Sequence, residues 1–296
     1  MIGIIGGTGL GESLGALGAG QSHTIETPFG MPSGPIVVTQ VAGVPVALLS
    51  RHGEGHLLSP SSVPYRANIY ALKSLGVTHI LASAAVGSLR EQIAPRDLVL
   101  PDQVIDKTFC RPNSFFDGMV AHVEMATPFC PSLRHVLSNV GESLPIKLHS
   151  RATYVCMEGP QFSTRAESDM HRAWGGDLIG MTLMPEAKLA REAEICYAAV
   201  ALATDYDCWR KRPDHREAEK DGDKLRLLEE IIGNVKVATQ NALSLIGMAL
   251  PALAAQAEKP CDCQSALKLG IWSDKRRIAD DVKERLGLII GKYMDQ

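Results

Sequence analysis

The sequence lacks several features that would have placed it in a specialised class. Its net charge is −3 over 296 residues, so no field of one sign draws it toward nucleic acid or an anionic membrane. No Lys/Arg-then-apolar signal opens the chain, and the longest helical apolar stretch, Leu243 to Ala255, contains Pro251 and is too short to span a bilayer. We therefore expect a cytoplasmic globular protein with no nucleic-acid or membrane partner.

Cysteine is also sparse, and its pattern favours neither a disulfide framework nor a metal site. The seven cysteines are odd in number and lie mostly in apolar runs, as reduced core thiols of a cytosolic protein do. Only Cys261 and Cys263 are close in sequence. This pair could form a disulfide or bind a metal, but two ligands without a nearby histidine make a weak metal site. We predict no bound metal.

What the sequence does contain is an alternation of strand-like and helix-like segments. Hydrophobic residues make up 45%, enough for the full core of one domain. Strands are expected over residues 1–5, 35–49 (a hairpin turning at Ala42-Gly43), 77–85, 97–100, 152–157, 178–181 and 195–203. Helices are expected over 64–74, 131–144, 225–250 and 278–292, near 185, and from 165, where Thr164 and Glu167 have capping-box spacing. The alternation predicts a single α/β domain with a mixed, largely parallel sheet flanked by helices.

Two acids mark the end of the most apolar of these strands. Asp205 and Asp207 follow the nine-residue apolar run 195–203, with one residue between them. In strand geometry, residues two apart share a face. The carboxyl ends of strands are where ligands bind in open α/β sheets. The pair is therefore either part of a binding site or two ordinary acids at a solvated strand end.

Glycine, alanine and basic residues mark other strand ends. The Gly-rich turn around Thr8 exposes N–H groups that could hold an anion, with the Thr8 hydroxyl as a further donor. Arg51 and His52 end the hairpin, and arginine offers a fixed fork of donors to phosphate or carboxylate. The small residues Ala84 and Ala85 permit close approach of a ligand to the backbone.

The same Gly-rich turn could belong to a dinucleotide-binding fingerprint. That motif needs an amphipathic helix after the turn, and residues 13–20 are Gly-rich instead. The acid at the right distance, Glu26, precedes the turn signal at 27–30 and does not end a second strand. A nicotinamide-dependent oxidoreductase is therefore a remote alternative.

Together, the motifs resemble those of the trimeric purine nucleoside phosphorylases. The resemblance rests on Gly-Gly-Thr-Gly at 6–9, Arg-His-Gly at 51–53, Glu-Gly-Pro-Gln-Phe-Ser at 158–163, and Met-Thr at 181–182 with Pro-Glu at 185–186. Thr-Asp-Tyr-Asp-Cys-Trp at 204–209 and Arg-Pro-Asn-Ser-Phe-Phe-Asp-Gly at 111–118 look like the branch acting on 5′-methylthioadenosine.

The resemblance covers residues 1–250, the expected nucleoside phosphorylase domain, and leaves 251–296 as a C-terminal extension packed on the same domain. It implies a homotrimer and a sheet that closes into a distorted barrel. It also implies phosphorolysis of 5′-methylthioadenosine to adenine and 5-methylthioribose 1-phosphate. Inorganic phosphate would be the co-substrate, without metal or organic cofactor.

The resemblance assigns roles to individual residues. Phosphate would be surrounded by Thr8, Arg51, His52, Ala84, Ala85 and Thr182. Phe162 would stack on the base, Met181 would lie under the ribose, and Asp205 and Asp207 would read the purine. Ser163 would tune base specificity, Ala218 is a candidate for the lid of the 5′ pocket, and His122 would reach the neighbouring subunit's 5′ pocket.

The chemistry of the carboxyl pair agrees with these roles. Breaking a glycosidic bond to a purine leaves negative charge on the base, which an acid positioned at N7 relieves. An acid beside an ionised carboxylate has a raised pKa, which makes Asp205 the expected proton donor. Ionised Asp207 only accepts hydrogen bonds, which suits a 6-amino group and repels a 6-oxo oxygen. A 6-oxopurine or methylthioinosine phosphorylase is the nearest rival, and a non-catalytic nucleoside-binding protein is a further alternative.

Overall fold

The computed structural model describes residues 1–13, 20–210 and 221–294, in which strands and helices alternate. The strands are β1 (Ile2–Gly6), β2 (Gln21–His23), β3 (Ile36–Val41), β4 (Val44–Ser50), β5 (His79–Ser88), β6 (Leu98–Val99), β7 (Gln103–Asp106), β8 (Leu148–His149), β9 (Thr153–Cys156), β10 (Leu178–Gly180) and β11 (Cys196–Asp205). The helices are α1 (Leu10–Ser13), α2 (Tyr65–Ser74), α3 (Pro131–Gly141), α4 (Arg165–Ala173), α5 (Leu183–Glu192), α6 (Asp221–Ala257) and α7 (Asp280–Met294).

The centre of the sheet is parallel. Strand β1 lies between β4 and β5 and runs parallel to both, and β11 runs parallel to β5. Antiparallel pairings occur further out, for example between β2 and β3 and between β5 and β10. The predicted α/β fold with a mixed sheet is therefore confirmed. Because β1, β4, β5 and β11 point the same way, their carboxyl ends meet at one edge.

The sheet is open. Among the described strands, the pairing path runs β2-β3-β4-β1-β5-β10-β9-β7, and β11, β6 and β8 branch from β5. The two ends of the path, β2 and β7, do not pair with each other. The expected closure into a barrel is not confirmed.

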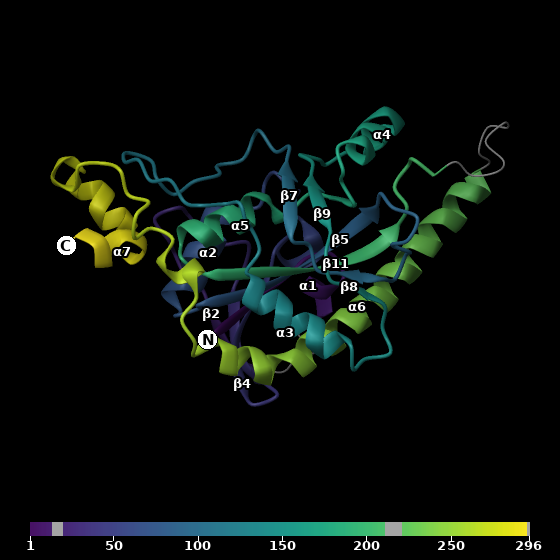
Figure 1. The fold of residues 1–296 in the computed structure, drawn as a ribbon, viewed down its shortest axis with the longest axis horizontal. Helices are drawn as coiled ribbons and strands as arrows, with labels where there is room; N and C mark the ends of the chain where they lie inside the picture. Colours follow the sequence, from purple (N-terminus) through teal and green to yellow (C-terminus); the bar gives the residue numbers. More distant parts are fainter. Residues whose placement is uncertain (14–19, 211–220, 295–296) are drawn as a thin grey trace.

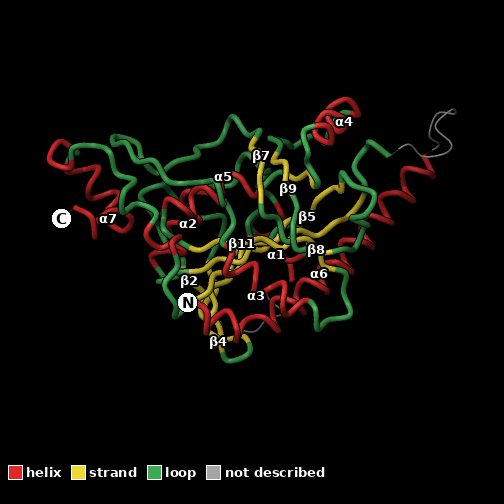
Figure 2. The backbone as a smooth tube through the Cα atoms, viewed as in Figure 1, coloured by secondary structure: helices red, strands yellow, loops and turns green. Residues whose placement is uncertain are grey.

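Helices cover the central strands on both sides. Figure 1 shows α3 and α6 on one side of β11 and α2 and α5 on the other, and Figure 2 shows the strands between these two groups of helices. Successive side chains of a strand point to opposite faces. Accordingly, Ile4 joins the core under α6, while Ile5 joins the core under α2 and α5. Burial of each such side chain stabilises the fold by about 1.5–3 kcal/mol.

Helix α6 is longer than its sequence periodicity indicated. By length and composition alone, its segment Leu225–Ala257 could cross a membrane, so the expectation that no helical apolar stretch reaches this length is wrong; the core helix of a globular protein has the same features. Fully buried residues of α6, including Ala242, Leu245 and Ala249, belong to the core cluster on the sheet. Apolar side chains of α6 are thus buried in the core of the domain.

Local sequence signals placed several elements correctly. The hairpin of β3 and β4 turns at Ala42 and Gly43, whose φ angles are 50° and 75°. Thr164 and Glu167 form the predicted capping box at the start of α4. The prediction missed β2, β7 and β8, which have three, four and two residues and are too short to show an alternating pattern.

The topology argues against a dinucleotide-binding unit. In that unit the second strand lies beside the first and parallel to it, after a crossover helix. Here the neighbours of β1 are β4 and β5, whereas β2 pairs antiparallel with β3 at the edge of the sheet. Glu26 therefore does not end a strand next to β1, and the nicotinamide-dependent alternative has no structural support.

The C-terminal segment shares the core of the rest of the chain. The boundary expected at residue 250 lies inside the continuous helix α6. Leu253 is buried in the cluster under α6, and Leu267 and Leu286 are buried in the cluster that also contains α2 and α5 residues. Residues 251–294 thus contribute side chains to both sides of the sheet.

Candidate active site

A cavity of about 520 Å³ lies at the carboxyl edge of the central strands. Eleven of the predicted site residues line it: Thr8, Arg51, His52, Ala84, Ala85, Phe162, Ser163, Met181, Thr182, Asp205 and Asp207. They come from segments far apart in the sequence. The parallel arrangement of β1, β4, β5 and β11 brings their ends together.

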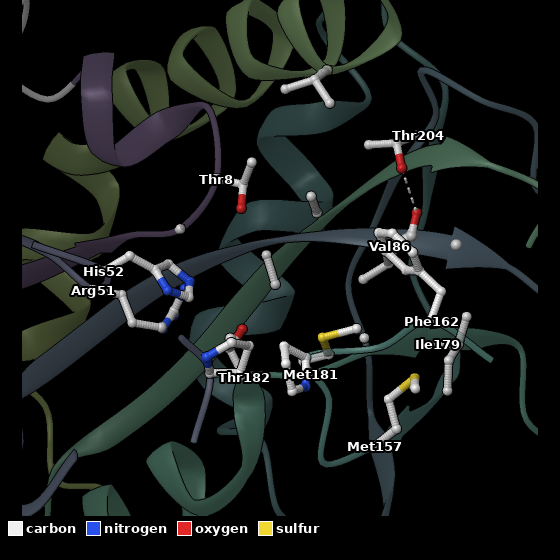
Figure 3. Close-up of a pocket in the computed structure, with 18 of the residues that line it drawn as sticks. Thr8, Arg51, His52, Val86, Met157, Phe162, Ile179, Met181, Thr182 and Thr204 are labelled. Carbon is white, nitrogen blue, oxygen red and sulfur yellow. Dashed lines mark hydrogen bonds between the residues drawn. The ribbon is translucent and has the colours of Figure 1, made fainter. Parts of the chain in front are cut away.

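The cavity has two ends of different character. Figure 3 shows Thr8, Arg51, His52 and Thr182 gathered at one end, and Thr204, Val86, Phe162 and Ile179 at the other, with Met181 between them. We call the first the anion end. The second is the acid end, because Asp205 and Asp207 line the cavity beside Thr204.

Arg51 is the cation of the anion end, and it is fully buried. Its Nε and Nη2 each donate to a carboxylate oxygen of Glu186 at 2.7 Å, and its Nη1 donates to the backbone oxygen of Ser83 at 2.7 Å. Burial alone would lower the pKa of Arg51, but the Glu186 carboxylate outweighs it and the pKa is raised. A guanidinium has five N–H bonds, so part of the fork is left for an anion.

His52 is neutral at pH 7. Burial lowers its pKa to about 4, and the charge of Arg51 acts in the same direction. The ring Nδ1 lies 2.7 Å from the backbone oxygen of Leu58, so the neutral ring donates there and leaves Nε2 as an acceptor. The ring also stacks on His56, with centroids 4.2 Å apart. His52 is thus suited to accept a hydrogen bond from a protonated phosphate oxygen.

The other groups at the anion end are uncharged. The side chains of Thr8 and Thr182 lie at this end in Figure 3. Ala84 and Ala85 line the cavity from β5 and have only backbone groups to offer. One buried arginine and several neutral donors suit a small oxyanion better than a long ligand that carries several negative charges.

Two glycines keep the two ends open. A Cβ at Gly7 would lie 2.6 Å from Nη1 of Arg51, so a side chain there would displace the guanidinium. A Cβ at Gly87 would lie 2.9 Å from Cγ2 of Ile179, closer than such contacts occur, and 3.2 Å from Oδ1 of Asp205. Both positions therefore need a residue without a side chain.

The carboxyl pair is fixed by hydrogen bonds. The two oxygens of Asp205 accept from the Thr204 hydroxyl at 2.8 Å and from the Asp207 N–H at 2.7 Å. Asp207 accepts from the Ser168 hydroxyl at 2.5 Å. Burial raises the pKa of Asp207, the charge of Asp205 adds to this, and the Ser168 hydrogen bond opposes it.

The mouth and middle of the cavity are apolar. Phe162 is 83% exposed and lines the mouth, where a planar ligand could cover it. Ser163 lies beside it, with its hydroxyl 3.8 Å from the sulfur of Met157. Met181 separates the two ends (Figure 3). A ligand that suits this cavity has a flat ring at the acid end and a smaller, less polar group in the middle of the cavity.

A buried ion pair braces this part of the cavity. Arg111 donates through Nε to Glu158 at 3.1 Å and through Nη1 to the backbone oxygen of Met181 at 2.6 Å. Burial would raise the pKa of Glu158, but hydrogen bonds from the Ser61 hydroxyl and from backbone N–H groups lower it to about 2. The pair thereby holds Met181 in place.

The structure adds residues that sequence reasoning missed. Ile231 and Val235, one turn apart on α6, line the cavity. Their helical spacing was visible, but nothing in the sequence indicated that this end of α6 reaches the strand ends. Glu186 and Ser168 were also missed as partners of Arg51 and Asp207. A buried arginine needs a carboxylate partner to compensate its charge. The motif Pro-Glu at 185–186 was the one feature of the sequence that could have indicated this partner.

Two predicted residues are not brought to this cavity. His122 is exposed, and its ring meets that of Trp272 edge to face, with centroids 5.0 Å apart. It does not line the cavity of its own chain. Ala218 lies outside the described residues.

An α/β sheet with an anion end and an acid end in one cavity defines a class of enzyme. Such a protein transfers a group from a planar, proton-accepting leaving group to an oxyanion. The chain belongs to the phosphorylase superfamily, whose family model matches residues 1–246.

Individual relatives and solved structures agree with this membership. The S-methyl-5′-thioadenosine phosphorylase of Geobacter sulfurreducens is 48% identical over 296 residues, 99% of each chain. The protein of the same name from Hyperthermus butylicus is 45% identical and covers 91% of this chain and 95% of its own. The crystal structure of a methylthioadenosine phosphorylase from an antarctic soil metagenomic library has a TM-score of 0.84 at 46% identity, covering 97% of this chain and 98% of its own. A methylthioadenosine phosphorylase from Schistosoma mansoni in complex with adenine has a TM-score of 0.78 at 32% identity, covering 100% and 99%.

Proposed function

We propose that this chain cleaves 5′-methylthioadenosine with inorganic phosphate, giving adenine and 5-methylthioribose 1-phosphate. The observation that carries the proposal is one cavity with Arg51 at one end and the pair Asp205 and Asp207 at the other. The relatives named S-methyl-5′-thioadenosine phosphorylase, at 48% and 45% identity over nearly the whole chain, support the same reaction.

The anion end holds and orients phosphate. Arg51 donates with the N–H groups that Glu186 and Ser83 leave unused, the hydroxyls of Thr8 and Thr182 add neutral donors, and Nε2 of His52 accepts from a protonated phosphate oxygen. A phosphate oxygen forms a bond to C1′ while the bond from C1′ to N9 breaks, and the electron pair of that bond moves onto the purine. The phosphate charge also stabilises the positive charge that develops on the sugar.

The acid end supplies the proton that the departing purine needs at N7. A 6-amino group donates to an ionised carboxylate, so a bound 6-aminopurine stabilises the charged form of Asp207. We assign the donation of this proton to Asp205, whose carboxyl group lines the cavity with that of Asp207.

The apolar surface of α6 favours a methylthio group at the 5′ position. Ile231 and Val235 line the cavity and have no hydrogen-bonding groups in their side chains. A 5′-hydroxyl group buried against them would lose its hydrogen bonds to water, which costs about 1–3 kcal/mol. We therefore propose a preference for 5′-methylthioadenosine over adenosine.

The nearest rival is a 6-oxopurine or methylthioinosine phosphorylase. An ionised Asp207 repels a 6-oxo oxygen, and its hydrogen bond from Ser168 holds it in one orientation. The same pair of carboxyl groups thus disfavours inosine-type nucleosides.

Purine release separates these possibilities. We expect phosphate-dependent release of adenine from 5′-methylthioadenosine, slower release from adenosine, and little hypoxanthine from inosine. Each substrate is measured with and without phosphate by absorbance or chromatography. Release without phosphate, or faster turnover of inosine, would contradict the proposal, and binding without turnover would point to a nucleoside-binding protein.

We further propose that the enzyme is a cytoplasmic homotrimer that needs no organic cofactor. Exposed apolar side chains near His122 support the assembly, since Trp272 is 72% exposed and Leu269 is 89% exposed. Exposed apolar side chains that lie near one another mark contact surfaces more often than single scattered ones do. In a trimer, His122 would reach the cavity of a neighbouring subunit.

Replacing His122 by Ala tests this contribution. We expect a lower kcat/KM for 5′-methylthioadenosine with an unchanged melting temperature, because the side chain is exposed in the single chain. His135→Ala, at an exposed position on α3, is the matched control and should leave kcat/KM unchanged. Sedimentation gives the oligomeric state, and a fully active monomer would refute the proposal.

A further inference from the structure

Four cysteines that are far apart in the sequence meet at the end of the sheet opposite the cavity. The Sγ atoms of Cys130, Cys196, Cys261 and Cys263 all lie within 4.8 Å of one another. Cys130 precedes the first residue of α3, Cys196 opens β11, and the other two follow α6. The sequence indicated only the close pair Cys261 and Cys263, so it gave no sign of four ligands.

We propose that this cysteine cluster is a structural zinc site with four thiolate ligands. Tetrahedral zinc with Zn–S bonds of about 2.3 Å places its sulfur atoms about 3.8 Å apart. The sulfur atoms of Cys130 and Cys261 are 3.7 Å apart. A disulfide would require about 2.05 Å, and all four cysteines are free thiols in the structure. The site revises our expectation that the chain binds no metal.

The surroundings of the cluster suit a closed structural site. Cys130, Cys196 and Cys263 are at most 5% exposed, and Cys261 is partly buried. Structural zinc sites have four protein ligands and no open position, whereas catalytic sites keep one position for water or substrate. Four cysteines buried to this degree leave no room for a substrate.

Positive groups lie where a zinc ion with four thiolates, which has a net charge of −2, needs them. Cys130 is the N-cap residue of α3, where the helix dipole favours a thiolate. Arg191 donates through Nη2 to the backbone oxygen of Thr127 at 2.6 Å, three residues before Cys130. Arg134 follows Cys130 by one turn, and its buried Nε has no hydrogen-bond partner among the described residues.

The cysteine cluster lies far from the acid end of the cavity, so its proposed role is to stabilise the fold. Cys196 and Asp205 are the two ends of the ten-residue strand β11, which puts the metal about 30 Å from the acid end at 3.3 Å per residue. Zinc would join the segment after α6 to the start of α3 and to the sheet. Because the unfolded chain does not hold these four ligands together, zinc binding adds directly to folding free energy.

Metal content tests the site. The protein is purified under reducing conditions without chelator, reconstituted with Zn²⁺ alone, freed of excess metal, and measured by plasma mass spectrometry. We expect about one zinc per chain in the wild type and about a tenth of that or less in Cys261→Ser/Cys263→Ser. Cys110→Ser, which replaces an exposed cysteine outside the cluster, should keep the full zinc content.

Two further measurements need no cluster variant. X-ray absorption at the zinc edge should give four sulfur neighbours at about 2.3 Å, and removing zinc with a strong chelator should lower Tm. Reconstituted, reduced wild-type protein that holds no zinc would overturn the proposal. So would iron in place of zinc, or two disulfides among these cysteines in protein that was never oxidised in vitro.

Discussion

Asp205→Asn is expected to lower turnover of 5′-methylthioadenosine by about 10²- to 10⁴-fold, the usual contribution of a general acid. The amide keeps the size of the carboxyl group and removes the proton that passes to N7. It can also donate to a 6-oxo oxygen, which a carboxylate cannot. Activity on inosine relative to 5′-methylthioadenosine should therefore rise. Steady-state kinetics on both substrates measure the two effects.

Asp207→Asn is the matched comparison for Asp205→Asn, because it changes the other carboxyl group of the pair. The Asp207 variant should weaken the preference for a 6-amino group with a smaller loss in turnover. Asp205→Asn also gives up one accepted hydrogen bond, from Thr204 or from the Asp207 N–H, which costs about 1–3 kcal/mol of stability. Melting curves show whether each variant is folded at the assay temperature. A folded Asp205→Asn enzyme with near-wild-type turnover and unchanged base preference would exclude the proposed mechanism.

Arg51→Met is expected to raise the KM for phosphate by about 10- to 100-fold, the loss of a charge-assisted contact worth about 1.5–3 kcal/mol. It also leaves the Glu186 carboxylate buried without its cation. Breaking a buried ion pair from one side costs about 3–5 kcal/mol of stability. The single variant is therefore expected to have a clearly lower Tm as well. Phosphate titration and thermal unfolding measure the two effects separately.

The double variant Arg51→Met/Glu186→Gln separates binding from stability. Glutamine has no charge to bury and can still accept the hydrogen bond that the Tyr197 hydroxyl donates at 2.8 Å. We expect it to recover most of the lost Tm while the high KM for phosphate remains. If the folded double variant has the wild-type KM for phosphate, Arg51 serves the fold and not the substrate.

Several site residues were predictable because they occur in short motifs at strand ends. The sequence placed Thr8, Arg51, Thr182 and Asp205 at such ends, and the structure brings all four to one cavity. The physical reason is that parallel strands share a direction, so their carboxyl ends lie at one edge. The resemblance to the purine nucleoside phosphorylases indicated the same residues.

The state of those residues was not predictable from the sequence. The pairing of Arg51 with Glu186, 135 positions away, was not expected from the sequence. Burial is the first cause of the raised pKa of Asp207, ahead of the charge of the neighbouring Asp205. Burial and distant partners depend on how the chain packs, and a local motif contains no information on either.

The sequence by itself determined the class of the fold, the strand ends that form the site and the reaction they support. The fold class follows from periodicity and the strand ends from short local motifs, while the reaction follows from the resemblance of those motifs to the purine nucleoside phosphorylases. Only the tertiary structure decided that the sheet is open, that Ile231 and Val235 line the cavity from α6, and that four cysteines meet. Each of these depends on contacts between segments separated by tens of residues, and such contacts are fixed by packing of the whole core.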